Sequence, residues 1–311
     1  MGLLRWLPLL LAFVAAVVGV PAGVSFLLGA ALAAMPVPSG QQLAEKSSKP
    51  LLQASVVLLG AGASLSTISA LGLRGVGLTL AVLLVTLGLA ALLGRIFELP
   101  SEVKLLIAFG TSICGASAIA AVAASRRSPA SATATALGVV LSLNALLLYV
   151  YPWVATQLGL SPVELGVWSA LGIHDTSSVV GAALRYSDAA VAPATTLKLL
   201  RALWILPVTA LIGLQRTAQD DTSLIAKRPR PWFILGFFFV VGLASLIGEH
   251  HPISKAMALM GRRMLGGALL LVGWSLPLSR LRQIGLRPFA FGALLAALVG
   301  GAALAMVKLV Y

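Results

Sequence analysis

LGIHDTSSVVG, residues 171–181, places His174, Asp175 and three hydroxyl side chains, Thr176, Ser177 and Ser178, inside an apolar stretch. Ionisable groups at membrane depth are costly, so they usually mark a pathway or a binding site. Glycines in this stretch let the backbone leave the helix, and the freed peptide groups then need a cavity lined by protein or water. We therefore expect a broken or re-entrant helix whose unwound centre is a substrate site.

The composition of the chain is that of a membrane protein. It is 59% hydrophobic and 10% charged, with a mean hydropathy of +1.01, whereas about 25% of the residues of a soluble domain are charged. Apolar segments approach the roughly 20 residues that span a bilayer, at 6–18, 22–36, 51–71, 75–97, 104–125, 132–157, 162–186, 190–214, 231–249, 256–279 and 287–310. The sequence predicts an all-α, polytopic helical membrane protein with about 9–11 membrane segments, two of them broken or re-entrant.

The net charge of +13 does not indicate a nucleic-acid partner, because the basic residues form short clusters between apolar segments. Such clusters mark the cytoplasmic loops of multi-pass inner-membrane proteins, whose partner is the lipid bilayer. The charge rule is satisfied best if segments 104–125 and 162–186 are re-entrant. Arg74, Arg185, Arg262 and Arg263 then remain as exceptions. The basic residues predicted to be cytoplasmic are Lys46, Lys49, Arg95, Lys104, Arg126, Arg127, Lys227, Arg228, Arg230, Arg280, Arg282 and Arg287.

Two internal repeats organise the chain. An offset of 213 aligns Gly60 with Gly273, and a weaker offset of 62 aligns Gly110 with Gly172, where chance resemblance among small residues stays an alternative. Inverted repeats are typical of secondary transporters. We therefore divide the chain into an extra N-terminal membrane helix (1–18), a three-helix scaffold repeat (19–97), a central transport core with two broken or re-entrant segments (98–215), and a second scaffold repeat (231–311), inverted relative to the first.

Four stretches resemble the signature segments of a bacterial sulfate exporter family of the YeiH type. They are LLQASVVLLGAGASL (51–65), GTSICGASAIAA (110–121), LGIHDTSSVVGAA (171–183) and TLKLLRALWILPV (196–208). The resemblance runs from about residue 20 to the C-terminus. It implies an inner-membrane transporter of a small anion, with a fold distantly related to sodium/proton antiporters and bile-acid symporters. It assigns no binding residues.

His174 and Asp175 are the first candidates for binding a substrate or a coupling ion. His174 titrates near neutral pH, and Asp175 either partners it or binds a cation, so we expect coupling to protons, with sodium as the rival. The structural alternative is a pair that caps a half-helix, because aspartate accepts hydrogen bonds from N–H groups at N-caps. Thr176, Ser177 and Ser178 are expected to line the substrate site, unless their hydroxyls bond back to their own helix.

Thr111, Ser112, Cys114, Gly115 and Ser117 form a matching cluster in the other special segment. The N–H groups at the start of a half-helix attract anions, so we expect these residues to contact the substrate from the opposite side. The alternative is close helix packing by small residues. Because Cys114 is the single cysteine, it has no intramolecular disulfide partner, and we expect no metal site and no cofactor.

Lys198 and Arg201 lie three residues apart, on one face of a helix inside an apolar segment. In a transporter they supply positive charge for a dianion or a counter-ion for Asp175. The alternative is that both side chains snorkel toward the membrane interface. Asn144, a single amide in the segment 132–157, is expected to bridge helices by hydrogen bonds.

The function that these features predict is ion-coupled transport of a small anion by alternating access, without enzymatic activity. A passive anion channel is the alternative from another class. An intramembrane serine hydrolase built from Ser177 or Ser178 with His174 and Asp175 is disfavoured, because neighbours on a helix point in different directions and no Gly-x-Ser-x-Gly turn is present. The chain also lacks the spacing of an ATP-binding loop. A homodimer stays an open alternative.

Overall fold

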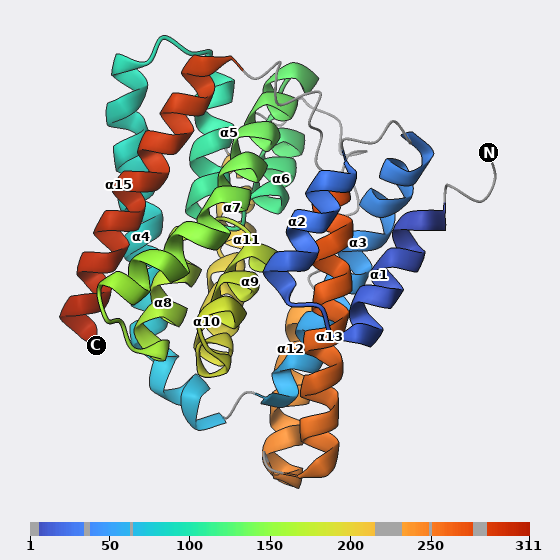
Figure 1. The fold of residues 1–311 in the computed structure, drawn as a ribbon. Coiled ribbons are helices and arrows are strands. Elements are labelled where there is room, and N and C mark those ends of the chain that lie inside the picture. Colours follow the sequence, from blue (N-terminus) through green and yellow to red (C-terminus); the bar gives the residue numbers. More distant parts are fainter. Residues whose placement is uncertain (1–5, 34–37, 63–64, 215–231, 249–250, 276–284) are drawn as a thin grey trace.

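A computed structural model of the protein describes residues 6–33, 38–62, 65–214, 232–248, 251–275 and 285–311 (Figure 1). Within these ranges the regular elements are helices and no strand is present. They are α1 (Leu7–Val18), α2 (Ala22–Leu32), α3 (Pro38–Leu59), the 3-10 turn η2 (Gly60–Gly62), α4 (Leu65–Ile96), α5 (Ser101–Ser112), α6 (Ala116–Arg126), α7 (Ala130–Gln157), α8 (Pro162–Gly172), α9 (Thr176–Tyr186), α10 (Asp188–Ala202), α11 (Ile205–Leu214), α12 (Trp232–Ile247), α13 (Pro252–Trp274) and α15 (Leu286–Val310). The predictions for Lys227, Arg228, Arg230, Arg280 and Arg282 lie outside the described residues.

Four described stretches are long and apolar enough to cross a bilayer, namely Gly72–Ile96, Ser131–Gln157, Pro252–Trp274 and Leu286–Val310. Two further apolar helices, Leu7–Val18 and Leu235–Ile247, are shorter. Large apolar side chains such as Phe13, Leu84 and Phe239 are exposed on the outside of these helices. This is the surface that a membrane protein presents to lipid, and it confirms the predicted helical polytopic class.

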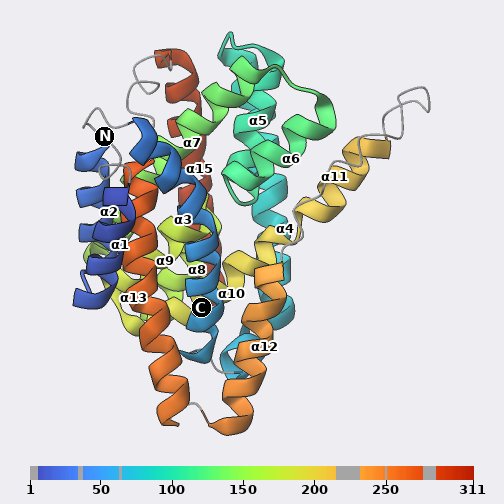
Figure 2. The ribbon, with the colours of Figure 1, turned by 90° about the vertical axis from the view of Figure 1, so that its right-hand side faces the viewer.

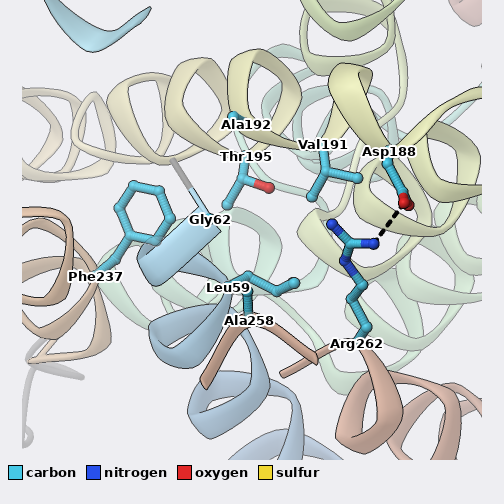
Figure 3. A pocket seen from close by; sticks show the side chains of 9 residues that line it. All are labelled: Leu59, Gly62, Asp188, Val191, Ala192, Thr195, Phe237, Ala258 and Arg262. Atoms are coloured by element: carbon cyan, nitrogen blue, oxygen red, sulfur yellow. Dashed lines mark hydrogen bonds and ion pairs between the residues drawn. The ribbon is translucent and has the colours of Figure 1, made fainter. Parts of the chain in front are cut away.

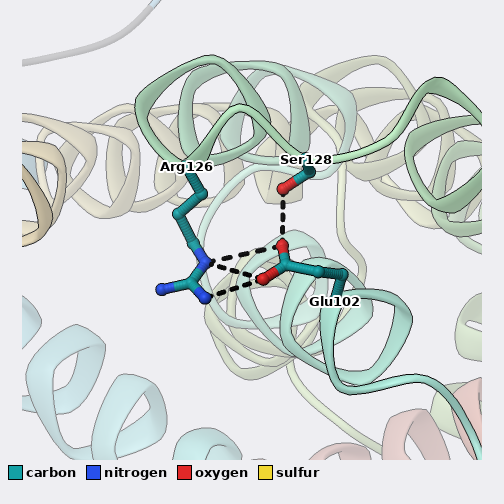
Figure 4. A network of polar contacts seen from close by, with 3 residues as sticks. All are labelled: Glu102, Arg126 and Ser128. Carbon is teal, nitrogen blue, oxygen red and sulfur yellow. Dashed lines mark hydrogen bonds and ion pairs between the residues drawn. The ribbon is translucent and has the colours of Figure 1, made fainter. Parts of the chain in front are cut away.

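The segment α5–α6 is a re-entrant hairpin. Residues 113–115 interrupt the helix, and α6 then returns to the end of the molecule at which α5 begins. Glu102 in the first turn of α5 accepts a hydrogen bond of 2.7 Å from Arg126 at the end of α6, and a second of 2.6 Å from the Ser128 hydroxyl (Figure 4). These contacts tie the two ends of the hairpin together.

The segment α8–α9 is a second re-entrant hairpin. At its base, the hydroxyl of Tyr186, the last residue of α9, donates to the carbonyl of Leu160 just before α8. A capping box fixes the start of α8: Ser161 accepts from the Glu164 N–H at 3.2 Å, and the Glu164 carboxylate accepts from the Ser161 N–H at 2.7 Å. The predicted interruption of this segment is therefore a hairpin whose two helices begin and end at the same end of the molecule.

The two hairpins open at opposite ends of the molecule (Figure 1). The helix α15 runs between these ends, because Arg287 at its start lies 3.5 Å from Glu98 and Lys308 near its end lies 3.0 Å from Glu164. Figure 2 shows the same arrangement from the side, with α5 and α6 at one end and α8 and α9 toward the other. After each hairpin the chain continues toward the opposite end of the molecule, through α7 after the first hairpin and through α10 and α11 after the second.

Outside this core, α13 packs against α1, α2 and α3. The backbones of α2 and α13 almost touch: a Cβ added to Gly29 would lie 2.0 Å from the carbonyl oxygen of Leu270, and one added to Gly273 would lie 2.3 Å from that of Phe26. Glycine is therefore required at both positions. Such close approach is how small residues join membrane helices.

Two predicted segments, 51–71 and 190–214, have different boundaries in the structure. The segment expected at 51–71 ends at Leu59, because Gly60–Gly62 breaks the helix. Residues 65–71 belong to α4, which kinks at Gly72. The helix α3 also begins earlier than the predicted segment, at Pro38. The polar residues between Pro38 and residue 51 are helical, although they are not apolar enough for the hydrophobic pattern to detect them. The segment expected at 190–214 is divided between α10 and α11, with the interruption at residues 203–204.

Candidate functional site

The tips of the two hairpins meet in the interior of the molecule. Gly115, at the first tip, has a φ of 65°. A Cβ added there would lie 3.5 Å from the Cβ of Asp175 and 3.6 Å from the carbonyl carbon of His174, at the second tip. The structure therefore brings together the two polar clusters that the internal repeat with an offset of 62 residues aligns with each other.

Each tip leaves helix carbonyls without an intrahelical partner, because the last four C=O groups of any helix lack an N–H from a following turn. In α5 these groups include Thr111 and Ser112, and in α8 they include Ala170 and Leu171. All four residues are buried, so they lie away from bulk solvent. Two cationic side chains from α10 provide the missing donors.

Lys198 donates to both tips. Its Nζ lies 3.2 Å from the carbonyl oxygen of Ile113 at the first tip, and 2.6 Å and 3.4 Å from those of Ile173 and Ala170 at the second. The side chain is fully buried. The number of acceptors equals the three N–H donors that an ammonium group offers.

Arg201, one helical turn further along α10, also joins the two tips. Its Nε donates to the carbonyl of Ser112 at 2.8 Å, and its Nη2 donates to that of Thr111. Its Nη1 donates to the carbonyls of Ala170, at 3.0 Å, and Leu171 on the other hairpin. Arg201 is fully buried as well, so neither cation snorkels to an interface.

Asp175 begins the outgoing half of the second hairpin. It is the N-cap of α9, where one carboxylate oxygen accepts from the Ser178 N–H at 2.7 Å and the other accepts from the Ser177 hydroxyl at 2.8 Å. The Ser177 hydroxyl thus bonds to the aspartate instead of the imidazole. These contacts are the cap that the sequence analysis gave as the structural role of Asp175, and they leave its side chain half-buried.

His174 is fully buried beside the tip. Its backbone N–H donates to the side-chain oxygen of Asn144 on α7 at 3.1 Å, so Asn144 bridges helices as predicted and holds the unwound backbone. Neither ring nitrogen has a hydrogen-bond partner of normal geometry among the described residues, although the backbone of Val140 faces the ring. His174 is therefore sealed from the outside in this conformation.

The residues at the junction of the tips differ in exposure, and those at one edge are at least partly exposed. Ser117, in the first turn of α6, is exposed, and Asp175 and Thr176 are half-buried, whereas Thr111, Ser112, Cys114, Ser177 and Ser178 are buried. The Ser112 hydroxyl bonds back to the Phe109 carbonyl at 3.2 Å. A solute at the junction would thus meet Ser117, Thr176 and Asp175 first.

Two aromatic residues that the sequence analysis missed hold the second hairpin in place. Tyr151 stacks on Trp168 with ring centroids 4.0 Å apart, and Trp168 Nε1 donates to the carbonyl of Gly300 at 2.8 Å. The Tyr151 hydroxyl occupies the space in which Gly172 and Gly300 would carry a side chain. No local pattern in the sequence indicates this contact, because it joins three separate helices.

Beside the core, a small pocket lies between α10, α13 and the end of α3 (Figure 3). Asp188 and Arg262 form an ion pair at its edge, and Thr195 and Phe237 line its interior. Elsewhere in the described part of the chain, no group of three or more His, Cys, Asp or Glu side chains is placed to hold a metal ion.

Comparisons with known proteins agree with this architecture. A family model described as "conserved hypothetical protein 698" matches residues 10–292. The UPF0324 membrane protein Bd1437 of Bdellovibrio bacteriovorus is 42% identical over 243 residues, which cover 78% of this chain and 75% of that protein. The UPF0324 membrane protein GSU2818 of Geobacter sulfurreducens is 35% identical over 285 residues, 92% of this chain and 90% of that protein. No solved structure matches. The chain therefore belongs to the UPF0324 family of membrane proteins.

Proposed function

We propose that this protein is a secondary-active transporter of a small anion, and that the solute binds where the two hairpin tips meet. The observation that carries the proposal is the pair of re-entrant hairpins that open at opposite ends and touch at Gly115 and Asp175. Interrupted helices that meet near the midplane are how many secondary transporters build a substrate site. A site between two such tips is reachable from either side by small movements of one hairpin.

The charges around the tips favour an anion. When both side chains are protonated, Lys198 and Arg201 bring two positive charges to the buried tips. Each of the two half-helix C-termini that they contact carries only about half a negative charge. The N-termini of α6 and α9 point toward the same junction, and each adds about half a positive charge. With Asp175 ionised, the junction retains a surplus of about one positive charge, which a monovalent anion would neutralise.

Asp175 is the group that couples transport to protons in this proposal. A proton on its carboxylate raises the surplus at the junction to about two positive charges, enough for a dianion. Asp175 is half-buried at the edge of the junction, whereas His174 is fully buried. His174 stays the second candidate, and sodium bound by Asp175 is the rival coupling ion.

The substrate class is a small oxyanion that hydroxyl and N–H groups recognise. Ser117 and Thr176 offer hydroxyl groups at the accessible edge of the junction, and the first turn of α6 offers backbone N–H groups. Sulfate and other sulfur-containing anions come from the resemblance in the sequence, since the names of the relatives state a membrane protein without a substrate.

We also propose a bacterial inner-membrane location, with the α5–α6 hairpin opening to the cytoplasm. Arg95, Lys104, Arg126 and Arg287 all lie at this end of the molecule, where Lys104 donates to the carbonyl of Gly94 at 2.8 Å. Positive charge on one side sets orientation in that membrane. The α8–α9 hairpin then opens to the outside.

Flux into proteoliposomes tests the proposal. Radiolabelled sulfate, sulfite, thiosulfate, taurine and small carboxylates are offered under an imposed pH gradient or an imposed sodium gradient. We expect one of these anions to accumulate with the pH gradient, and Asp175→Asn to abolish the dependence on that gradient. Glu98→Gln, which neutralises an exposed acid outside the tips, is the matched control. Equal gradient-driven accumulation in wild type and Asp175→Asn would remove Asp175 as the coupling residue.

A passive anion channel is the second candidate, because the same surplus of positive charge attracts an anion into a pore. The two functions differ in one measurement. A carrier accumulates solute against its own gradient when a second gradient is imposed, whereas a channel only equilibrates it. Wild-type flux that stops at equal concentrations under every imposed gradient would establish the channel.

A further inference from the structure

Three of the four arginines that violate the charge rule meet in one cavity. Arg185 at the end of α9 and Arg262 and Arg263 on α13 line a cavity of about 380 Å³, together with the turn between α1 and α2. The cavity is at the end of the molecule where the α8–α9 hairpin opens, since Arg262 pairs with Asp188 at the start of α10 (Figure 3). Convergence from two distant parts of the chain makes this a built site.

The cavity has an excess of positive charge. No acidic side chain is among the described residues that line it. Asp188, just outside, pairs with Arg262 alone, and the Nε of that arginine is buried without a hydrogen-bond partner among the described residues. The guanidinium of Arg185 lies 4.8 Å from the ring centroid of Tyr149, a contact that orients the side chain without neutralising its charge. About two positive charges therefore remain for a ligand.

The other wall of the cavity is apolar. Val18, Val20 and Pro21 from the turn between α1 and α2, with Leu184 and Leu259, face the arginines. The helix α1 continues this surface, because Phe13, Val14 and Val17 are exposed along it. A free inorganic ion gains nothing from an apolar wall, whereas an amphiphile places its anionic group on the arginines and its chain along α1.

We propose that this cavity binds the phosphate group of an anionic phospholipid. Guanidinium groups match phosphate oxygens with paired, charge-assisted hydrogen bonds, and basic pockets between membrane helices hold anionic head groups. The lipid would connect α1 and α13 with the end of α9, and so brace the second hairpin at its base. The proposal does not depend on the transported solute, because the cavity is separate from the hairpin tips.

Native mass spectrometry of the detergent-purified protein tests this proposal. The protein is titrated with phosphatidylglycerol, with phosphatidylcholine, and with inorganic phosphate added as a competitor. The double variant Arg185→Gln/Arg263→Gln keeps the Arg262–Asp188 ion pair and neutralises the other two arginines. Lys255→Gln removes one positive charge from an exposed position on α13 outside the cavity and is the matched control.

We expect wild type and Lys255→Gln to bind phosphatidylglycerol in preference to phosphatidylcholine, and the double variant to lose at least about tenfold in affinity for phosphatidylglycerol. Equal binding of the two lipids, or unchanged affinity in the double variant, would overturn the proposal. Displacement of the lipid by millimolar phosphate would also overturn it, because the cavity would then be a site for a free anion. Circular dichroism confirms that the double variant is folded.

Discussion

At the scale of single residues, the most informative feature is a pair of cations buried where no carboxylate balances them directly. Lys198 and Arg201 bond to backbone carbonyls of both hairpin tips. A buried charge is tolerated when hydrogen bonds and opposite charge replace the lost hydration. Here the opposite charge is the negative end of two half-helices, so these residues stabilise the unwound backbone that a solute site requires.

Replacing Arg201 by methionine is expected to destabilise the protein by about 3–5 kcal/mol, the range found when one partner of a buried charged pair is removed. The carbonyls of Thr111, Ser112, Ala170 and Leu171 would lose their donor. Arg201→Lys keeps the charge without the forked geometry, so its stability should lie between those of the wild type and Arg201→Met. Thermal unfolding in detergent measures the order of stability of the three proteins. An Arg201→Met protein as stable as one with the exposed Arg95 replaced by methionine would contradict this account.

The Tyr151 hydroxyl offers a sharper test of packing. A Cβ on Gly300 would lie 2.6 Å from that hydroxyl and 3.6 Å from the next atom of the ring. Gly300→Ala should therefore lower the melting temperature, and Tyr151→Phe in the same protein should restore it, because the hydroxyl is the obstacle. The neighbouring Gly301→Ala meets no atom within 4 Å and is expected to be neutral or slightly stabilising. Failure of Tyr151→Phe to rescue Gly300→Ala would show that another contact is responsible.

At the scale of elements, each hairpin is fixed at its base by side chains and at its tip by the cations of α10. The base of α5–α6 is held by Glu102, Arg126 and Ser128, and the base of α8–α9 by Tyr186 and the capping box. In the transport cycle that we propose, a hairpin held at both ends would move as a rigid unit. The two hairpins would then separate from each other at the junction of their tips.

The base of the first hairpin has a predictable pH dependence. Hydrogen bonds from Arg126 and then Ser128 lower the pKa of Glu102 below its ordinary value of 4.5. A lowered pKa means that the contribution to stability is present above the unfolded-state pKa and is lost as the pH falls through the folded-state pKa. We expect Glu102→Gln to lower the melting temperature at pH 7, by less than about 1 kcal/mol in free energy because the pair is partly exposed.

The difference between wild type and Glu102→Gln should therefore shrink as the pH is lowered below about 4.5, the ordinary pKa of the carboxyl group. Melting temperatures from pH 7 to pH 3 provide the measurement. Glu98→Gln is the control, since Glu98 is largely exposed and lies 3.5 Å from Arg287. A difference that stays constant across this range would mean that the ionised form of Glu102 is not what stabilises the hairpin.

At the scale of the whole molecule, the arrangement is two opposed hairpins enclosed by long helices. The hairpins place both tips at one depth, while α7 and α15 run from one end of the molecule to the other (Figure 1). The bundle of α1, α2, α3 and α13 packs beside them. This organisation places the junction of the tips between the two ends of the molecule.

The orientation of the hairpins can be measured by cysteine labelling in a Cys114→Ala background. Ser101→Cys lies at the start of α5, and Ser131→Cys lies after α6, in the first turn of α7. Both should react only from the cytoplasmic side. Gln157→Cys and Ala189→Cys flank the second hairpin and should react only from the opposite side. All four positions are exposed. Labelling of Ser101→Cys and Ser131→Cys from different sides would rule out a re-entrant first hairpin.

The sequence by itself determined the class of protein and the positions of the two polar hairpin tips at which helices break. Hydrophobic segments of bilayer length and a low charge content leave few alternatives to a helical membrane protein. Glycines beside polar residues marked both tips, and the distribution of arginine and lysine favoured re-entry before any contact was known. These are local properties, or sums over the chain, and they do not require knowledge of which helices touch.

Only the tertiary structure decided what the polar residues contact. Lys198 and Arg201 could equally have met a solute, Asp175 or an interface, and the structure assigns them to carbonyls 25 to 90 residues away. It likewise joined Tyr151 to Gly172 and Gly300, and gathered Arg185, Arg262 and Arg263 in one cavity. Periodicity and composition report the environment of a residue, whereas its partners depend on how distant helices pack, which no short stretch of sequence contains.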